Sequence, residues 1–303
     1  MSMEDVLVRA TVGDARVYAV TTTHLTQQMN EIHQCSPLAA AALGRTAAGA
    51  LMLAATMKDG EAVTLRFKGN GPLGQVMADA RDYTVRGFVE HPSVMLPLKN
   101  GKLDVGGGVG HEGVLIVTRC PEKGAPFNGY ALLKSGEIAD DLTKYLYVSE
   151  QTPSSVALGV LVDKDGSIAV SGGYFVQPLP GADEHCLEIL ENNVLTLPYV
   201  TELLRSGHSP EDMIRLVGKG LAVDIMDRHP VSFHCSCSRE GVEHMLTGLP
   251  DKEFASMLED PRTEVKCQYC GRTYLFSQDE MKALSRVKAE STHTAATPAE
   301  TRK

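Results

Sequence analysis

The chain has 303 residues, of which 43% are apolar and 22% charged. At roughly 100–200 residues per domain this is the length of two domains, and the apolar fraction excludes an intrinsically disordered chain. The formal charge of −9, from 29 Lys and Arg against 38 Asp and Glu, argues against a broad nucleic-acid-binding face, because such a face needs clustered cations.

The sequence shows no targeting or membrane segment. Asp5, Arg9 and Asp14 interrupt the start of the chain, where a secretory signal would have an apolar core. The most apolar runs, residues 47–55 and 156–162, are far shorter than the ~20 residues that span a bilayer. We therefore expect a cytoplasmic protein that contacts neither membrane nor nucleic acid.

Residues 1–180 read as a mixed α/β core domain. Alternating β-branched residues predict strands at 6–10, 15–20 and 63–68, and a hairpin whose strands are 160–162 and 168–170. Ser36 and Pro37 provide an N-cap and a first-turn proline for a helix over 39–57. The fold class we predict is α+β, with a mainly antiparallel sheet.

Residues 181–230 read as a helical linker. Apolar residues recur at helical spacing over 182–194, a short helical turn is expected at 199–204, and Ser209-Pro210 begins a helix over 213–217. Helices this short are not stable in isolation, so they need a surface on which to pack. The apolar residues expected to face that surface are Leu187, Ile189, Leu190, Val194, Leu195, Met213, Ile214, Leu216 and Val217.

Residues 231–287 are expected to form a small zinc-binding domain, followed by a disordered tail over 288–303 that shows no periodicity. Cys235-Ser236-Cys237 and Cys267-Gln268-Tyr269-Cys270 contribute four thiols, separated by twenty-nine residues. Two thiol pairs at such a spacing, in a chain without a secretory signal, predict a four-cysteine zinc site. In an extended strand residues i and i+2 share a face, so Cys235 and Cys237 can both reach one ion.

Several alternatives stay open on the motif alone. A structural zinc ribbon that never changes state is the simplest reading. His234 or His244 can replace one thiol as a ligand. A thioredoxin-like redox site is disfavoured, since it would place its Cys-x-x-Cys beside a βαβ unit. Arg239, Lys266 and Arg272 lie close enough in sequence to offset the charge of four thiolates.

The remaining motifs carry little chemistry. Gly69-Asn70-Gly71-Pro72-Leu73-Gly74 matches a phosphate-binding pattern, but Pro72 has no N–H to offer, so we read it as a turn between strands. Cys35, Cys120 and Cys186 are expected to pack as small hydrophobic residues, with a resolving thiol as the alternative. We find no catalytic constellation and expect a protein that is not an enzyme.

The chain resembles the redox-regulated heat-shock chaperones of bacteria, the thirty-three-kilodalton chaperonin family. The Cys-x-Cys and Cys-x-x-Cys pairs carry the resemblance, which extends over residues 3–285. Further stretches that match are Ala42-Leu43-Gly44-Arg45, Gly71-Pro72-Leu73-Gly74, Gly101-Lys102-Leu103-Asp104-Val105-Gly106, Ser135-Gly136-Glu137-Ile138-Ala139, Ser149-Glu150-Gln151-Thr152-Pro153-Ser154 and Leu179-Pro180-Gly181-Ala182.

The resemblance implies a holdase that needs no ATP. In such proteins one zinc ion per chain, here on Cys235, Cys237, Cys267 and Cys270, keeps an inactive monomer folded. Oxidants convert the thiols into the disulfides Cys235–Cys237 and Cys267–Cys270 and release the zinc. The zinc domain and the linker then lose structure, and an active homodimer captures unfolded client proteins.

The residues and the resemblance together suggest that the linker lies on the core domain in the resting state, held partly by the folded zinc domain. Two other classes of function stay open. One is a cytosolic enzyme whose active site lies in the core domain, with the ribbon as a static brace. The other is a binding module that docks a partner through the ribbon.

Overall fold

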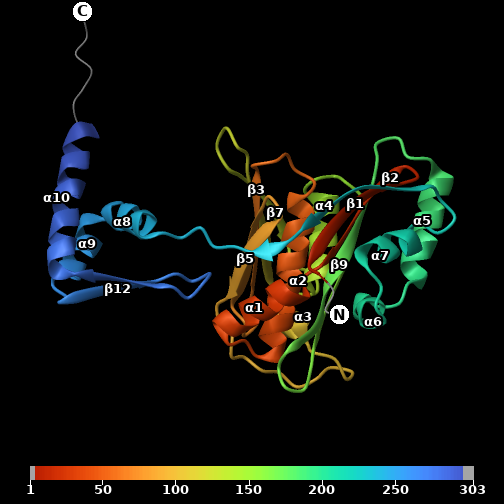
Figure 1. Cartoon of the computed structure of the whole chain (residues 1–303), viewed down its shortest axis with the longest axis horizontal. Helices are drawn as coiled ribbons and strands as arrows, with labels where there is room; N and C mark the ends of the chain where they lie inside the picture. Colours follow the sequence, from red (N-terminus) through yellow and green to blue (C-terminus); the bar gives the residue numbers. More distant parts are fainter. Residues whose placement is uncertain (1–3, 296–303) are drawn as a thin grey trace, which may run out of the picture. The chain divides into compact units, whose positions relative to one another are not determined.

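The computed structural model describes residues 4–295, with side chains described up to Lys288. The chain divides between His234 and Cys235 into two compact units, and many of their elements are labelled in Figure 1. The division lies slightly later than the expected boundary at 231, because Ser232 and Phe233 pair with a strand of the first unit. Each unit is described by itself below.

The first unit contains two sheets. The five-stranded sheet has the order β10-β1-β2-β9-β8, and every neighbouring pair in it is antiparallel. The six-stranded sheet has the order β11-β5-β4-β3-β6-β7 and is antiparallel except where β11 pairs with β5. This confirms the prediction of a mainly antiparallel α+β fold. The strands are β1 (Val6–Val12), β2 (Ala15–Thr21), β3 (Ala62–Gly69), β4 (Gln75–Arg81), β5 (Thr84–Val89), β6 (Gly113–Cys120), β7 (Phe127–Leu132), β8 (Ser155–Val162), β9 (Ile168–Pro178), β10 (Val223–Pro230) and β11 (Ser232–Phe233).

Helix α2 (Pro37–Ala54) packs against strands of both sheets. Its N-cap is Ser36, whose hydroxyl accepts from the Ala39 N–H, as the sequence predicts. Small residues allow close packing: a Cβ added at Gly44 would lie 2.6 Å from a methyl carbon of Thr26. Among residues 4–295, α2 is the helix whose length and composition would suffice to cross a bilayer, but 89% of it is buried inside the protein. The other helices of the core are α1 (Thr23–His33), α3 (Val105–Val109) and α4 (Ile138–Val148).

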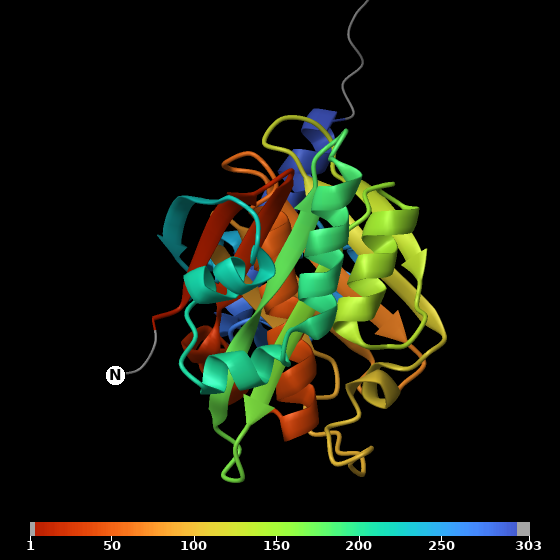
Figure 2. The same cartoon turned by 90° about the vertical axis from the view of Figure 1, so that its right-hand side faces the viewer.

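Three short helices cover the outer face of the five-stranded sheet (Figure 2). They are α5 (Glu184–Thr196), α6 (Val200–Arg205) and α7 (Pro210–Val217), close to the predicted positions. Alternate β1 residues such as Val8 and Val12 face these helices, whereas Leu7 faces the cluster around α2. The central strands β1, β2 and β9 are therefore largely buried on both faces, and the linker lies on the core domain as we expected.

Two details of the linker differ from the expectation. Leu195 is 74% exposed and does not belong to the buried face, since it follows Val194 and points away from the sheet side of α5. Residues 223–230, expected within a helical linker, form β10 instead. Their side chains alternate between half-buried and exposed, and Arg9 of β1 forms a bidentate ion pair with Asp227 across the strand pair.

The second unit contains a hairpin of β12 (Arg262–Lys266) and β13 (Thr273–Ser277) and three helices, α8 (Arg239–Thr247), α9 (Asp251–Leu258) and α10 (Gln278–Ala295). A small core joins them: Leu246, Phe254, Tyr274, Phe276 and Met281.

The disordered tail expected from residue 288 is wrong over 288–295, where α10 continues. Lys288 Nζ explains part of this order, because it donates to the carbonyl oxygens of Thr247 and Leu249. Residues 296–303 of that expected tail lie outside the described residues.

Candidate metal centre

The four clustered cysteines meet at one point of the second unit. Their Sγ atoms all lie within 4.8 Å of one another, and Cys235 lies 3.8 Å from Cys267 and Cys237 3.3 Å from Cys270. Sulfurs bound to one Zn²⁺ at ~2.3 Å in a tetrahedron are about 3.8 Å apart. The four thiols therefore fit a single tetrahedral zinc ion.

The turn between β12 and β13 positions the second pair. Cys267 N–H donates to the Arg272 carbonyl, and Gly271 N–H donates back to the Cys267 carbonyl, both over 2.9 Å. Gly271 has φ +70°, a left-handed conformation that a glycine adopts without steric cost. This closed turn holds Cys267 and Cys270 on the same side of the hairpin end.

The loop between β11 and α8 positions the first pair. Residues 234–238 form no strand, so the extended-strand explanation for the Cys-x-Cys pair is not what the structure shows. The loop is fixed at its end by Ser238, whose hydroxyl accepts from Gly241 N–H at 3.1 Å and caps α8. Cys235 and Cys237 thus reach the cluster from an irregular segment that ends at a capped helix.

The surroundings of Cys237 favour its thiolate. Tyr274 Oη donates to Cys237 Sγ over 3.1 Å, and Arg272 Nη1 donates to the Cys237 carbonyl over 3.4 Å. Burial raises the pKa of Cys237, but the hydrogen bonds from Tyr274 and from the other three thiols outweigh it and lower the pKa to about 7. Burial raises the pKa of Cys270 to about 12, and its hydrogen bond to Cys237 acts in the same direction. These contacts therefore favour the thiolate form at Cys237 and disfavour it at Cys270.

The basic side chains predicted to offset the charge of the four thiolates differ in what they contact. Arg272 lies beside Cys237, and its hydrogen bond to Tyr274 raises the pKa of the guanidinium, with the charge of Cys237 adding to this. Arg239 instead pairs with Glu280 at 2.7 Å and lies over the Phe276 ring. It stabilises the fold of the unit and not the charge of the sulfurs.

The alternative histidine ligands do not join the group. Within the described residues, the metal-competent cluster in this unit consists of the four cysteines and includes neither His234 nor His244. The donor set of four soft sulfurs suits Zn²⁺ and disfavours hard ions such as Mg²⁺ or Ca²⁺.

The three single cysteines lie elsewhere. Cys186 is buried among the linker helices and Cys35 packs against the core around α2, where burial raises its pKa to about 12. Cys120 ends β6 and is half-buried. For Cys35 and Cys186 this agrees with the prediction that they act as small hydrophobic residues.

The glycine motif at 69–74 is the turn from β3 to β4, as predicted. Gly71 N–H and Leu73 N–H donate to the carbonyls of Val109 and Gly108, at 2.9 and 3.0 Å. Because these donors already have backbone partners, the loop does not offer them to a phosphate.

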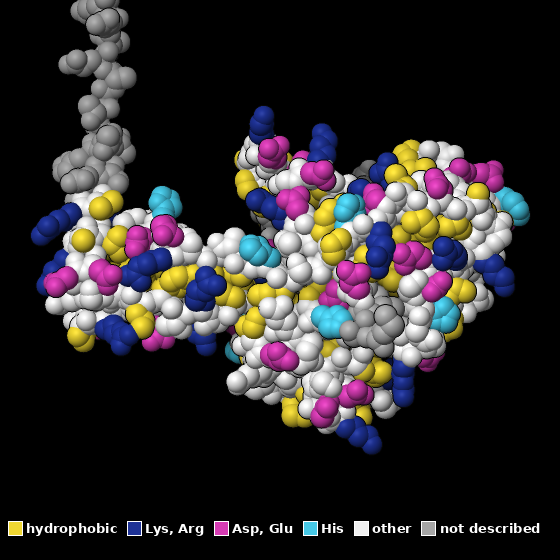
Figure 3. Space-filling model, viewed as in Figure 1, with side chains coloured by type: hydrophobic (Ala, Val, Ile, Leu, Met, Phe, Trp, Pro, Cys, Tyr) yellow, Lys and Arg dark blue, Asp and Glu magenta, His cyan; other side chains and the backbone are white. Residues whose placement is uncertain are grey.

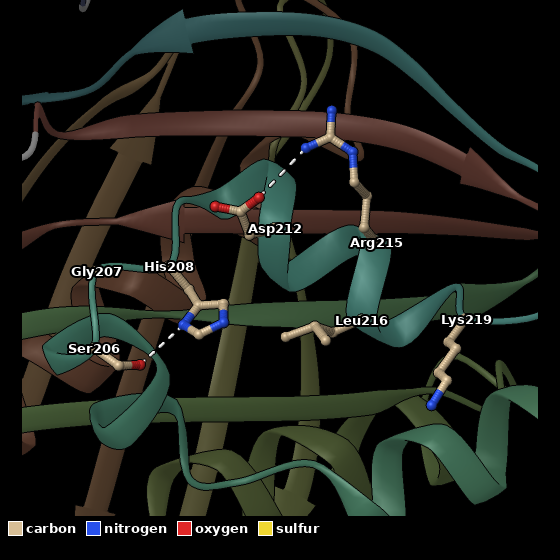
Figure 4. Close-up of a pocket in the computed structure, with 7 residues that line it drawn as sticks. All are labelled: Ser206, Gly207, His208, Asp212, Arg215, Leu216 and Lys219. Carbon is tan, nitrogen blue, oxygen red and sulfur yellow. Dashed lines mark hydrogen bonds and ion pairs between the residues drawn. The ribbon is translucent and has the colours of Figure 1, made fainter.

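A hollow of about 430 Å³ lies over the end of α6 and one side of α7 (Figure 4). Its polar groups bond to one another: His208 Nδ1 contacts Ser206 Oγ at 2.9 Å, and Arg215 Nη1 lies 3.4 Å from Asp212. Asp212 also accepts from Ser209 N–H, completing the cap of α7. Asp212 therefore serves the cap of α7, whereas Lys219, which also lines the hollow, takes part in none of these contacts.

Comparison with known proteins agrees with this description. A family model described as Hsp33 protein matches residues 5–277. The chain is 41% identical over 287 residues to a 33 kDa chaperonin of Desulforamulus reducens, covering 93% of this chain and 97% of that one. It is also 41% identical over 295 residues to a 33 kDa chaperonin of Lactiplantibacillus plantarum, covering 95% and 100%.

A solved structure is similar as well. The crystal structure of a 33 kDa chaperonin (heat shock protein 33 homolog) from Thermotoga maritima matches with a TM-score of 0.87 and 33% identity, over 95% of this chain and all of that one. The fold and the cysteine cluster thus define a chaperone with an α+β core and a small cysteine-rich C-terminal unit. The chain belongs to the Hsp33 family of 33 kDa chaperonins.

Proposed function

We propose that this protein is a redox-regulated, ATP-independent holdase of the cytoplasm. In this proposal it is not an enzyme: it binds unfolded client proteins and protects them from aggregation during oxidative stress. Zinc on the four cysteines holds the inactive state, and oxidation to the disulfides Cys235–Cys237 and Cys267–Cys270 releases the metal and produces an active homodimer. The observation that carries the proposal is the convergence of four sulfurs, from two distant segments, within 4.8 Å.

The size of the second unit makes its fold dependent on the metal. Its core consists of five buried side chains, and a core in a unit this small rarely supplies more than ~3–5 kcal/mol. Structural zinc contributes an apparent ~10–16 kcal/mol to such domains when bound. Loss of zinc should therefore unfold the unit.

Disulfides within each pair cannot replace the metal. Each would close a loop of one or two intervening residues, which restricts the unfolded chain very little. The zinc ion instead joins Cys235 and Cys237 to a hairpin about thirty residues further along the chain. Oxidation should thus destabilise this unit, whereas disulfides usually stabilise a protein.

The linker supplies the apolar surface that clients would bind. Met213, Ile214 and Val217 of α7 are completely buried against β1 and β2. On the face of the resting protein in Figure 3, apolar side chains are interspersed with acidic and basic ones. Release of α5–α7 would expose apolar surface on both the helices and the sheet, and surfaces of that kind bind non-native chains.

One experiment tests the proposal. Zinc-loaded, reduced protein is treated with hydrogen peroxide at raised temperature, and released zinc, free thiols and suppression of client aggregation are followed together. We expect zinc release, loss of four thiols and protection of the client to occur in parallel. Retained zinc without client protection would instead support a static zinc brace in an enzyme or a docking module.

Hydrogen exchange tests the linker separately. After oxidation we expect protection of the amides in residues 183–228 to fall strongly, because the helices lose the sheet on which they pack. Unchanged protection over 183–228 would overturn this part of the mechanism even if zinc is released.

A further inference from the structure

Tyr274 connects the cysteine cluster to the core of the second unit. In β13 alternate side chains point inward, so Tyr274 and Phe276 are 8% and 0% exposed. The Tyr274 ring packs in the cluster that contains Leu246, Phe254 and Met281, and its hydroxyl donates to Cys237 Sγ over 3.1 Å. The hydrogen bond thus runs from a well-packed strand to a sulfur held by an irregular loop.

A hydrogen bond to a zinc-held thiolate changes how that sulfur reacts. The donor withdraws electron density from the sulfur, and partners of this kind also fix the orientation of metal ligands. A sulfur with less electron density is a weaker nucleophile. Because a zinc-held cysteine is already deprotonated, the hydroxyl cannot speed the reaction by producing more thiolate, so only the loss of nucleophilicity remains.

We propose that Tyr274 is a positioning residue that slows oxidation of the Cys235/Cys237 pair in the zinc-loaded protein. The inference rests on the proposed function and adds to it the residue that sets the oxidant threshold of this pair. Arg272 supports the arrangement, since its guanidinium donates to the Cys237 carbonyl at 3.4 Å and fixes the same loop.

The chemical step that Tyr274 slows is ordinary thiol oxidation by hydrogen peroxide. One thiolate attacks a peroxide oxygen, the O–O bond breaks, and a sulfenic acid and hydroxide form. The second thiolate attacks the sulfenic sulfur, the S–S bond forms, and a second hydroxide leaves. Two electrons pass from the sulfurs to peroxide, the two hydroxides take protons from solvent to become water, and the zinc ion leaves with its charge unchanged.

The test compares the full-length wild type with Tyr274→Phe, which keeps the ring and removes the hydroxyl. Zinc-loaded proteins are treated with hydrogen peroxide, and free thiols are labelled at short times by differential alkylation. Trypsin separates the two pairs, because it cuts after Arg228, Arg239, Lys266 and Arg272 and so places them on peptides 229–239 and 267–272. Initial zinc content confirms that both proteins start loaded.

We expect the initial oxidation rate of peptide 229–239 to rise about three- to tenfold in Tyr274→Phe, within the range that one hydrogen bond to a charged sulfur accounts for. The initial oxidation rate of the cysteines in peptide 267–272 should change by less than about twofold. Phe276→Leu is the matched control: it loosens the same core but removes no hydrogen bond to a cysteine, so it should alter both peptides alike.

A spectroscopic measurement keeps the test independent of chaperone activity and of oxidation. Cadmium replaces zinc in both proteins, and the cadmium NMR resonance is compared. A shifted resonance in Tyr274→Phe but not in Phe276→Leu supports the hydrogen bond to a coordinating sulfur, and identical resonances in all three proteins overturn it.

The outcomes separate the two proposals. If the wild type keeps its thiols and zinc under peroxide, the proposed function fails and this inference fails with it. If the wild type is oxidised but Tyr274→Phe behaves identically, or accelerates both peptides as Phe276→Leu does, only the role of Tyr274 is overturned.

Discussion

The backbone N–H of Asp14 donates a hydrogen bond to Sγ of Cys186 over 3.4 Å. It joins the turn between β1 and β2 to the first turn of α5, 172 residues further along the chain. The adjacent Gly13 has φ +51°, and a Cβ there would lie 2.6 Å from the same sulfur. The start of the linker is therefore held by a turn that leaves no room for a side chain.

Gly13→Ala should loosen the linker. The left-handed backbone costs an L-residue about 1–2 kcal/mol, and the added methyl group must displace Cys186. Gly166→Ala is the control, because Gly166 has φ +87° but nothing lies within 4 Å of its Cβ position. We expect both variants to lose stability in urea, and only Gly13→Ala to lose amide protection across 184–196. Equal protection of 184–196 in the two variants would contradict the packing role of Gly13.

Local sequence signals were sufficient for much of the first unit. Ser36-Pro37 and Ser209-Pro210 predicted where two helices begin, and the structure shows both caps. Helix caps depend on contacts between residues that are neighbours in the chain, so a single sequence is enough to predict them. β10 escaped prediction because its partner β1 lies more than two hundred residues away, and nothing near β10 encodes that pairing.

Ile214→Ala tests whether the apolar face of α7 holds the linker in place. Ile214 is 0% exposed, and removing a buried side chain of this size costs about 2–5 kcal/mol. Leu195→Ala is the matched control, since Leu195 is 74% exposed in α5 and its loss should change stability by less than about 0.5 kcal/mol. Urea denaturation followed by circular dichroism measures both. Under the proposed function, Ile214→Ala also suppresses client aggregation at lower oxidant concentration, whereas Leu195→Ala matches the wild type.

Asp212 should make the linker sensitive to acid. The pKa of Asp212 is lowered by its hydrogen bonds from the backbone N–H and the hydroxyl of Ser209. A carboxylate whose pKa is lowered by folding stabilises the protein above its unfolded pKa of 3.8, and this contribution disappears as the pH falls through the lower folded value.

Asp212→Asn keeps the shape and removes the charge. Because charge-assisted caps are stronger than neutral ones and this one is partly exposed, we expect a loss of about 0.5 kcal/mol at neutral pH. The difference in the free energy of unfolding between Asp212→Asn and wild type should vanish below the pKa of Asp212 in the folded protein. Urea denaturation of reduced, zinc-loaded wild type and variant, at neutral pH and at a pH below the folded pKa, measures the difference, and any zinc loss in acid is common to both proteins. A difference that persists in acid would rule out the charge as its cause.

The cysteine cluster was predictable because two thiol pairs at this spacing match a four-cysteine zinc site. The residues that contact these cysteines could not be predicted in the same way. Alternation in β13 indicates that Tyr274 faces inward, but not that its hydroxyl ends at Cys237, because that contact depends on the path of the loop after β11. The prediction that Arg239 offsets the charge of the thiolates was wrong for the same reason. Arg239 is close to the cluster in sequence, but its side chain pairs with Glu280.

Lys288→Met should destabilise the second unit. Lys288 Nζ donates to the carbonyls of Thr247 and Leu249 and lies 3.2 Å from Asp251. Met keeps much of the apolar stem but leaves those carbonyls without this donor, so we expect a loss of about 1 kcal/mol in zinc-loaded protein. Lys282→Met is the control on the same helix, since Lys282 is 55% exposed. Thermal unfolding of the two variants measures the difference, and equal midpoints would show that Lys288 does not order α10.

Cys267→Ser examines the metal centre itself. Serine offers a neutral hydroxyl in place of a thiolate, and the turn that holds Cys267 is closed by backbone bonds that the substitution keeps. Since loss of even a ligand's hydrogen-bond partner weakens metal binding ~10–100-fold, loss of the ligand should weaken it by at least about a hundredfold. Cys120→Ser, in β6 of the first unit, is the control and should keep one zinc per chain by elemental analysis. We expect amide protection over 239–288 to fall in Cys267→Ser only, because under the proposed function zinc supplies the cross-link that the small core lacks. Full zinc content in this variant would mean that the four sulfurs do not form the site.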